Sequence, residues 1–225
     1  MTPTPVRHAA RLAAALLAAG ICCLPGGALA QRAPVAPAVV QEVRPARVYL
    51  IRGLFDVFSL GMDRLGSHLR RDGHTARVYG AASADALTAE IIVRRQAAPE
   101  ETVVIIGHSL GADAAIRIAN RVQRAGAAPL ALVVTFDPTS RQELRGGARR
   151  VVNLFQSNNG WAVPVNRGAA FAGRLDNEDL RDMGGINHLN IEKSGALHRR
   201  VQAWVAGAVA EGRPVSRPAP ARPRR

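Results

Sequence analysis

Cysteine is nearly absent from this sequence. The two cysteines, Cys22 and Cys23, both fall within the first 30 of 225 residues. The rest of the chain has no thiol, which excludes disulfide scaffolds, cysteine nucleophiles and cysteine-based metal or redox sites there. The chain also lacks a His-x-x-x-His pair, a carboxylate cluster at metal-ligand spacing, and the Lys-Ser/Thr partner of a phosphate-binding loop. We therefore expect no metal and no other cofactor.

Lysine and aromatic residues are scarce as well. Of 30 basic residues only Lys193 is a lysine, and the chain holds five Phe, two Tyr and two Trp. The arginines are spread along the whole chain, and so few rings offer little surface for base stacking. Despite a formal charge of +13 we therefore predict no nucleic-acid binding. A weak association with anionic membrane surfaces stays open, and the oligomeric state is not indicated.

Long apolar runs are absent outside the N-terminal region. There, Arg7 and Arg11 precede an apolar run over 12–24 that is too short to span a bilayer, and residues 28–30 read Ala-Leu-Ala, a small-x-small cleavage site. We interpret residues 1–30 as a signal peptide. The protein is then expected to be exported, to the periplasm or the extracellular medium.

Two alternatives to a cleaved signal peptide stay open. One is a retained N-terminal anchor, and the other is a lipoprotein acylated at Cys22 or Cys23, although Ile21 before Cys22 departs from the usual acylation pattern. Cleavage would leave 28 basic against 17 acidic residues, a formal charge of +11.

The mature chain divides into three parts by composition. Residues 31–45 are rich in Ala, Pro and Val without periodicity, which indicates a flexible linker, and residues 212–225 repeat Arg and Pro, which indicates a disordered tail. Residues 46–211 between them suffice for one domain with a single core.

Within that domain short β-branched runs alternate with longer amphipathic ones, which predicts an α/β fold with a mostly parallel sheet covered by helices on both faces. Gly73 and Gly126 are expected in left-handed conformation at helix ends. Five strands are predicted, over 47–51, 75–79, 102–106, 130–136 and 151–155. Four helices are predicted, over 59–71, 84–96, 110–125 and 196–210.

The most informative motif is Gly107-His108-Ser109-Leu110-Gly111, which follows an apolar strand and precedes a helical pattern. This is the pattern of a nucleophile elbow, in which the serine occupies a strained turn between strand and helix. Side chains two positions before and after the serine would collide with neighbouring backbone. Gly107 and Gly111 remove both collisions, so Ser109 is the candidate nucleophile.

With this elbow the chain resembles the α/β-hydrolase superfamily, and within it the small secreted lipases and esterases without a large cap domain. The resemblance covers about Val48 to Trp204, and it implies a minimal three-layer α/β-hydrolase fold and a triad in the order Ser, acid, His. It rests on the elbow and on three further segments, Arg52-Gly53-Leu54-Phe55, Phe136-Asp137-Pro138 and Asn187-His188-Leu189-Asn190-Ile191.

A serine hydroxyl needs a base to take its proton as it attacks a carbonyl. His188 is the candidate, because it lies in a Gly-rich loop between the last predicted strand and the last predicted helix, from which it can reach Ser109. The other histidines fall in the leader, in or after an early helix, in the elbow, or in the last helix: His8, His68, His74, His108 and His198.

A carboxylate must hold the imidazole in the right tautomer and stabilise its protonated form. Asp137 directly follows the strand beside that of the nucleophile, so it is the leading candidate. Many α/β-hydrolases carry the acid one strand later, but here that strand ends in 155–159, Phe-Gln-Ser-Asn-Asn, without an acid. Asp176, Asp179 and Asp182, in the segment before His188, stay open as rivals.

Two backbone amides normally stabilise the oxyanion of acyl transfer. The resemblance assigns them to Leu110, after the nucleophile, and to Leu54, with Phe55 as the alternative. Arg52 stands where lipases commonly carry a His before the glycine, which weakens this part of the match.

Apolar residues near the first strand and after the fifth are expected to contact the substrate, namely Phe55, Phe58 and Trp161, although they fit a hydrophobic core equally well. Residues 160–186 show no clear periodicity, which is typical of a lid or a binding loop.

Taken together, these features predict an exported serine hydrolase, esterase-like or lipase-like, that cleaves a carboxylic ester or thioester of a small molecule or lipid through an acyl-enzyme intermediate. The chain length of the acyl group, the leaving group and an amide as substrate stay open. The alternative from another class is a catalytically silent α/β-hydrolase scaffold that binds an envelope component or an anionic surface.

Overall fold

The computed structural model describes residues 45–54, 60–159 and 162–212, all of which belong to one compact unit, Glu42–Arg225. The predicted signal peptide, almost all of the predicted linker and almost all of the predicted tail lie outside the described residues. So do the three predicted substrate-binding residues Phe55, Phe58 and Trp161.

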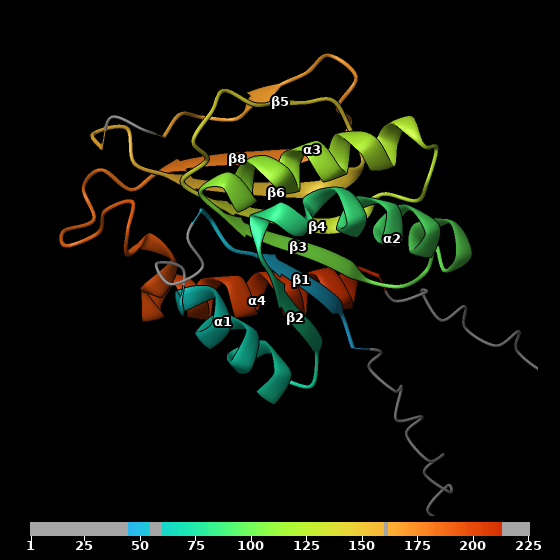
Figure 1. Cartoon of the computed structure of the whole chain (residues 1–225), viewed down its shortest axis with the longest axis horizontal. Coiled ribbons are helices and arrows are strands. Elements are labelled where there is room, and N and C mark those ends of the chain that lie inside the picture. The colour runs from blue at the N-terminus through green and yellow to red at the C-terminus, as the bar shows by residue number, and fades with distance from the viewer. Residues whose placement is uncertain (1–44, 55–59, 160–161, 213–225) are drawn as a thin grey trace, which may run out of the picture. The chain divides into compact units, whose positions relative to one another are not determined.

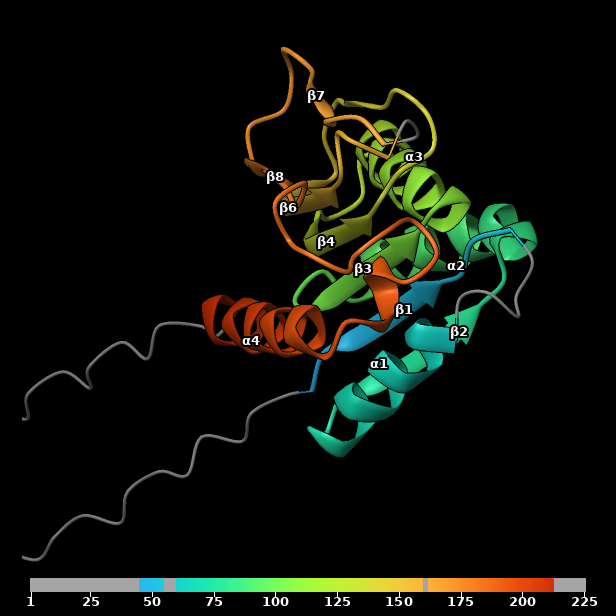
Figure 2. The same cartoon turned by 90° about the vertical axis from the view of Figure 1, so that its left-hand side faces the viewer.

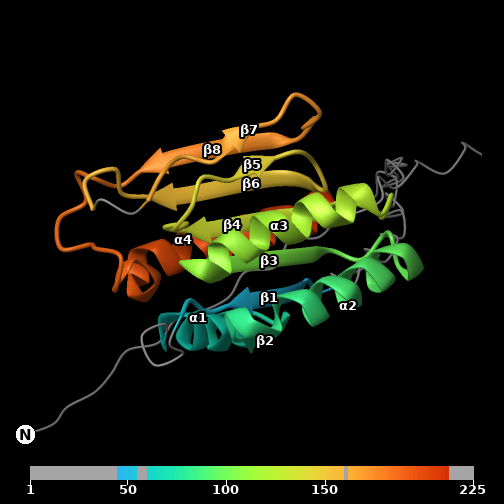
Figure 3. The same ribbon diagram turned by 45° about the horizontal axis from the view of Figure 1, so that its top comes forward.

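Six parallel strands form the central sheet, in the order β2-β1-β3-β4-β6-β8 (Figure 1). Figure 3 shows the strands side by side, with their arrowheads pointing the same way. Because every adjacent pair is parallel, all the carboxyl ends meet at one edge of the sheet, and the loops that follow the strands converge there. The strands are β1 (Arg47–Ile51), β2 (Thr75–Tyr79), β3 (Val103–His108), β4 (Leu130–Phe136), β6 (Ala148–Phe155) and β8 (Arg174–Asp179).

Helices cover both faces of this sheet, as the sequence predicts. One core cluster packs α1 and α4 against one face, and a second packs α2 and α3 against the other (Figures 1 and 2). Successive strand residues point to opposite faces, so neighbours such as Leu50 and Ile51 belong to different clusters. The helices are α1 (Leu60–Arg71), α2 (Ala84–Ala97), α3 (Leu110–Arg124) and α4 (Gly195–Glu211).

Most predicted boundaries agree with the structure to within two residues. β3 extends two residues beyond its predicted end, to His108, and β6 begins three residues earlier than predicted, at Ala148. Gly73 and Gly126 have φ of +88° and +61°, which confirms the left-handed helix ends.

The prediction of five strands misses one strand of the central sheet and both short strands of a second sheet. Residues 160–186, predicted to lack regular structure, contain the edge strand β8. They also contain β7 (Asn166–Arg167), which pairs with β5 (Glu143–Leu144) in a separate two-stranded sheet. β8 has the sequence Arg-Leu-Asp-Asn-Glu-Asp, with a single apolar residue, so it carries no hydrophobic pattern. An edge strand with one neighbour tolerates such a polar sequence.

A line of polar side chains connects β4, β6 and β8 near their carboxyl ends, and two of its members, Thr135 and Asn153, are buried. The Thr135 hydroxyl donates to Asn153 Oδ1 at 2.8 Å, and Asn153 Nδ2 donates to Asn177 Oδ1 at 2.9 Å. Asn177 in turn exchanges hydrogen bonds with the backbone of Val165, at 2.9 and 3.0 Å. A shift of one residue between these strands would leave buried polar atoms unpaired, so the line fixes the position of the loops that follow.

Candidate active site

Ser109 occupies the sharp turn between β3 and α3. Its φ of +57° lies in the left-handed region, which confirms the strained conformation predicted for a nucleophile elbow. A Cβ on Gly107 would lie 2.2 Å from the carbonyl oxygen of Gly111, and a Cβ on Gly111 would lie 2.2 Å from that of Ile51. The two glycines are therefore required by close backbone contacts, as predicted. The Ser109 amide donates to the Phe136 carbonyl at 2.9 Å, which ties the elbow to β4.

His188 lies in the loop that enters this site from the far end of the sheet. Its Nε2 is 3.1 Å from Ser109 Oγ, although 79 residues separate the two in the sequence. The loop folds on itself around Asn187, whose carbonyl accepts from the Ile191 amide at 2.9 Å and whose side chain accepts from the Leu189 amide at 2.9 Å. The imidazole is therefore held by a locally ordered turn.

Asp137 follows β4 directly and is fully buried. Its Oδ2 lies 2.9 Å from His188 Nδ1, so the structure brings serine, imidazole and carboxylate into one hydrogen-bonded chain. The Gln156 amide donates to the other oxygen, Oδ1, at 2.9 Å. Asp137 also has a positive φ, +53°, and Ser109 and Asp137 are the two non-glycine residues with positive φ among the described residues.

The three rival acids are engaged elsewhere or exposed. Burial would raise the pKa of Asp176, but hydrogen bonds from Arg174 and Arg150 outweigh it and lower that pKa below its ordinary value. Burial likewise opposes the bonds that Asp179 accepts from Ser157 and Arg181, which prevail and lower its pKa to about 2. Asp182 is exposed in the loop after β8. Of the four candidates, Asp137 is the one bonded to His188.

The predicted oxyanion donors flank the nucleophile. Leu110 is the first residue of α3, whose following amides, those of Ala112 and Asp113, both donate to the Ser109 carbonyl. The amide of a first helical residue has no acceptor within its own helix. On the other side Gly53 lies against the nucleophile, because a Cβ there would be 2.8 Å from Ser109 Cβ and 3.3 Å from its Oγ. The backbone that leads to Leu54 therefore adjoins the reacting oxygen.

Three polar residues of the site were not predicted from the sequence, namely His108, Gln156 and Asn159. His108 Nε2 lies 2.9 Å from the His188 carbonyl oxygen and donates to it, because a carbonyl only accepts, and burial lowers the pKa of His108 to about 4. Asn159 donates to Asp137 Oδ2, and Gln156 Nε2 donates to the Ile186 carbonyl at 2.9 Å. All three end or follow a strand at the carboxyl edge of the sheet. A polar residue at the end of a predicted parallel strand is the sequence signal by which they could be found.

Glu192 is a further buried ionisable residue close to His188. It lies in the short 3-10 helix Ile191–Lys193, where a Cβ on Gly61 of α1 would come within 2.2 Å of its carbonyl oxygen. Its side chain is fully buried, with the Lys193 ammonium 3.9 Å away, and burial raises its pKa to about 7. The loop of His188 is thus packed directly on the first turn of α1.

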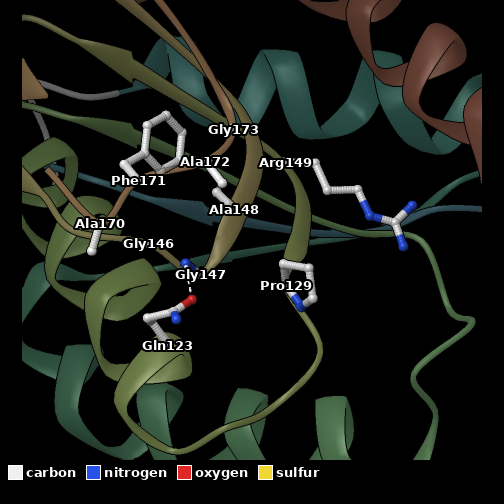
Figure 4. Close-up of a pocket in the computed structure, with 10 residues that line it drawn as sticks. All are labelled: Gln123, Pro129, Gly146, Gly147, Ala148, Arg149, Ala170, Phe171, Ala172 and Gly173. Atoms are coloured by element: carbon white, nitrogen blue, oxygen red, sulfur yellow. Dashed lines mark hydrogen bonds between the residues drawn. The ribbon is translucent and has the colours of Figure 1, made fainter. Parts of the chain in front are cut away.

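A hollow of about 370 Å³ lies away from these residues (Figure 4). Pro129 precedes β4, Ala148 begins β6 and Gly173 precedes β8, so the hollow adjoins the amino ends of the strands. Ser109 lies beyond the carboxyl end of β3, and a seven-residue strand such as β4 separates the two edges by about 20 Å. The hollow is therefore not part of the site around Ser109.

Neither a metal site nor a membrane span is found in the part of the chain that the structure describes. No group of three or more His, Cys, Asp or Glu side chains there is arranged to hold a metal ion. No helix there combines the length and the apolar character needed to cross a bilayer.

Comparison with known proteins places the chain in a family. No curated protein sequence matches it. Human thioesterase 2 superposes with a TM-score of 0.49 at 8% identity, over 77% of this chain and 100% of that one. The type II thioesterase BorB from the borrelidin biosynthetic cluster gives 0.45 at 13%, over 72% and 96%. A cutinase-like protein from Cryptococcus sp. gives 0.44 at 15%, over 73% and 95%.

The match that decides the family is one of sequence. The Thioesterase domain family matches residues 64–203, which is more than half of the chain and includes the elbow, Asp137 and His188. The chain therefore belongs to the thioesterase domain family of the α/β-hydrolase superfamily, and it is a serine hydrolase that acts on ester or thioester bonds.

Proposed function

We propose that the chain is an exported hydrolase in which Ser109, His188 and Asp137 form a catalytic triad that cleaves an ester or thioester through an acyl-enzyme intermediate. One observation carries this proposal, the continuous hydrogen-bond chain from Ser109 Oγ to His188 Nε2 at 3.1 Å and from His188 Nδ1 to Asp137 Oδ2 at 2.9 Å. These distances allow proton transfer without rearrangement of the loops.

In the first half-reaction Ser109 Oγ attacks the acyl carbon while its proton passes to His188 Nε2. Asp137 accepts a hydrogen bond from Nδ1–H, which fixes the tautomer and stabilises the imidazolium that forms. The amides of Leu110 and Leu54 are assigned to the developing oxyanion. When the tetrahedral intermediate collapses, the bond from carbon to the leaving oxygen or sulfur breaks, and the leaving group takes the proton from Nε2.

In the second half-reaction water replaces the leaving group. His188 Nε2 takes a proton from the water as its oxygen attacks the acyl-Ser109 carbonyl, and the same amides stabilise the second oxyanion. Collapse releases the carboxylic acid and returns the proton to Ser109 Oγ. The cycle uses no redox step and no group other than the substrate and water.

The surroundings of Ser109 support an apolar acyl group as the part of the substrate held by this domain. Leu110 follows the nucleophile, Leu189 follows His188, and Leu54 follows Gly53. All three are among the large hydrophobic side chains that the described structure leaves exposed, and Leu189 is 57% exposed. Exposed leucines next in sequence to the nucleophile, to the base and to Gly53 favour contact with a hydrocarbon chain.

Labelling with a fluorophosphonate tests the nucleophile. Wild-type protein is expected to react, and Ser109→Ala is expected to lose all labelling, while Ser140→Ala at an exposed loop position serves as the matched control. A wild-type protein that does not label would instead favour a silent scaffold that binds an envelope component or an anionic surface.

A series of p-nitrophenyl esters tests the acyl preference. Leu189→Ser is expected to raise the KM for octanoate by about 5- to 30-fold, because lost burial of a leucine costs about 1–2 kcal/mol, and to leave the KM for acetate nearly unchanged. Val93→Ser, on α2, is the control for an equally exposed apolar residue elsewhere. Equal effects of the two substitutions would contradict a role for Leu189 in acyl binding.

Export is proposed from residues 1–30 alone. N-terminal sequencing of protein recovered from outside the cytoplasm is expected to begin at Gln31, and an intact N-terminus in the cytoplasm would contradict this part of the proposal.

Sedimentation with anionic vesicles, measured against salt concentration, tests the weak membrane association that the arginine content favours.

A further inference from the structure

The loop after β6 contacts both the acid and the loop of the base. Asn159 Nδ2 donates to Asp137 Oδ2, the same oxygen that accepts from His188 Nδ1. The orientation of the Asn159 amide is fixed, because its Oδ1 accepts from the Ala162 amide at 3.1 Å. A flipped amide would place oxygen against the Asp137 carboxylate and nitrogen against an N–H group.

Gln156 completes the connection from the same loop. Its backbone amide donates to Asp137 Oδ1 at 2.9 Å, and its side-chain Nε2 donates to the Ile186 carbonyl at 2.9 Å, two residues before His188. Asp137 therefore accepts hydrogen bonds at both oxygens from residues of one loop, and that loop also holds the segment that carries the imidazole.

We propose that Asn159 is a positioning residue for the reaction, which holds the Asp137 carboxylate in line with His188; this inference rests on the proposed function. Asp137 is buried and directly follows β4, and hydrogen bonds from the loop after β6 reach both of its carboxylate oxygens. Without Asn159, Oδ2 would keep the hydrogen bond to the imidazole alone, and the carboxylate could turn about the bond to Gln156.

The chemical nature of the amide suits this role. A lysine or arginine at position 159 would also bind the carboxylate, but its positive charge would oppose the imidazolium that forms during attack. A carboxylate at 159 would repel Asp137. A neutral amide supplies a donor without adding charge, and so it aligns Asp137 while leaving the charge of Asp137 available to His188.

Adjacent asparagines provide a matched control. Asn158 is exposed and its side chain donates to the Arg181 carbonyl at 3.3 Å, away from Asp137. The experiment measures the rate of fluorophosphonate labelling against pH for wild type, Asn159→Leu and Asn158→Leu, with thermal unfolding of each protein to verify that it is folded.

Asn159→Leu is expected to lower the labelling plateau by about tenfold or more, as loss of a hydrogen bond to a charged group does, and to move the half-plateau pH downward. The downward direction follows because a misaligned carboxylate stabilises the imidazolium less, so the base is protonated only at lower pH. Asn158→Leu is expected to match wild type. A half-plateau pH that stays in place or rises overturns the proposal, because a purely structural role for Asn159 changes the amount of folded protein and not the pH response.

If Asn159→Leu does not fold, Asn159→Asp tests the positioning role of Asn159 instead. Two carboxyl groups in contact share a proton, so this nearly isosteric variant keeps a donor to Asp137 only while that proton is bound. Its labelling rate is expected to fall again as the pH rises, whereas Asn158→Asp keeps the plateau of wild type. A rate reduced by one factor at every pH overturns the proposal. Failure of wild type to label would instead reject the proposed function, so the two failures are distinguishable.

Discussion

The two edges of the central sheet differ in what they bury. At the carboxyl edge lie Ser109, 7% exposed, and Asp137, fully buried, each hydrogen-bonded to His188. At the amino edge lies the hollow of about 370 Å³, which small residues such as Ala148 and Gly173 line. Burial of polar groups disfavours folding unless each is paired, whereas a hollow lined largely by small residues needs no such pairing. Convergent buried polar groups therefore indicate the site better than the size of a hollow does.

The two edges also differ in which residue types have a positive φ. In the segments that lead into the amino ends of the strands, positive φ falls on glycines, namely Gly73, Gly126 and Gly147. In the segments that follow the carboxyl ends it falls on Gly185 and also on Ser109 and Asp137, where a glycine would avoid the strain but would have no side chain for chemistry. Strain at non-glycine residues is thus confined, among the described residues, to two members of the proposed triad.

The largest expected effect is on activity, and it compares a substitution at the carboxyl edge with one at the amino edge. His188→Gln removes the proposed base and should lower ester hydrolysis by about 10⁴-fold or more, since loss of a triad base elsewhere costs up to about a millionfold. Arg149→Gln, at the rim of the hollow, should leave the rate within about twofold. Steady-state hydrolysis of a p-nitrophenyl ester measures both, and a large loss in Arg149→Gln would reverse the assignment of the edges.

The identity of the acid gives the next largest effect. Asp137→Asn should reduce turnover by about 10⁴-fold, because an amide in place of the carboxylate favours the wrong imidazole tautomer. Asp176→Asn should change turnover by less than about threefold, because Asp176 is bonded to Arg150 and Arg174. The same ester assay compares the two variants. Similar losses in both would reopen the choice of acid.

Close backbone packing occurs at both edges, so alanine at Gly111 or at Gly147 should lower stability. The two substitutions should differ in their effect on the labelling rate. A Cβ at Gly111 would lie 2.2 Å from the Ile51 oxygen, and a Cβ at Gly147 would lie 1.8 Å from the Ala119 oxygen. Both alanine variants should lose about 3 kcal/mol or more in urea unfolding. The folded fraction of Gly147→Ala should label at the wild-type rate and that of Gly111→Ala more slowly. Equal labelling rates would contradict a specific role for Gly111.

The smallest expected effect concerns one carboxyl at each edge, the buried Glu192 and the partly exposed Glu101. Burial raises the pKa of Glu192 to about 7, so between pH 4.5 and 7 the folded protein binds more protons than the unfolded chain and stability falls as the pH rises. Glu192→Gln removes this dependence, and at pH 8 it should be more stable than wild type by at most about 3 kcal/mol, with little difference at pH 4.5.

Glu101, at the amino edge, provides the contrast. It forms ion pairs with Arg47 and Arg94 and is 21% exposed, so Glu101→Gln should lower stability at pH 8 by about 1 kcal/mol. Urea denaturation at both pH values measures each variant. If Glu192→Gln is no more stable than wild type at pH 8, the Glu192 carboxyl is better solvated than its burial indicates.

Local sequence is sufficient to predict the elbow and the candidate residues of the triad. The Gly-x-Ser-x-Gly pattern is visible in the sequence, although Gly107 is required by a contact within the turn and Gly111 by a contact with distant Ile51, and Asp137 directly follows a strongly apolar strand. The position of His188 after the last predicted strand is enough to bring it to the right edge, since loops after parallel strands converge there. Whether the three residues catalyse the reaction stays a prediction.

The rest of the site depends on contacts that no local pattern contains. Asn159 and Gln156 are ordinary polar residues in a loop, and they are important only because the register of β4 and β6 brings that loop to Asp137. His108 is part of the motif, but its bond to the His188 carbonyl spans 80 residues. β8 was missed because its pairing with β6, and not a hydrophobic period, defines it as a strand.

The composition of β8 has a consequence for the protein at high concentration. Four of its six residues are charged, and Asp176, Glu178 and Asp179 form ion pairs with arginines of other segments. A second molecule that added a strand to this outer border would crowd those ion pairs without supplying new counter-charges. Sheets that end in such a border resist growth into fibrils, so aggregation through β8 is disfavoured without any covering helix.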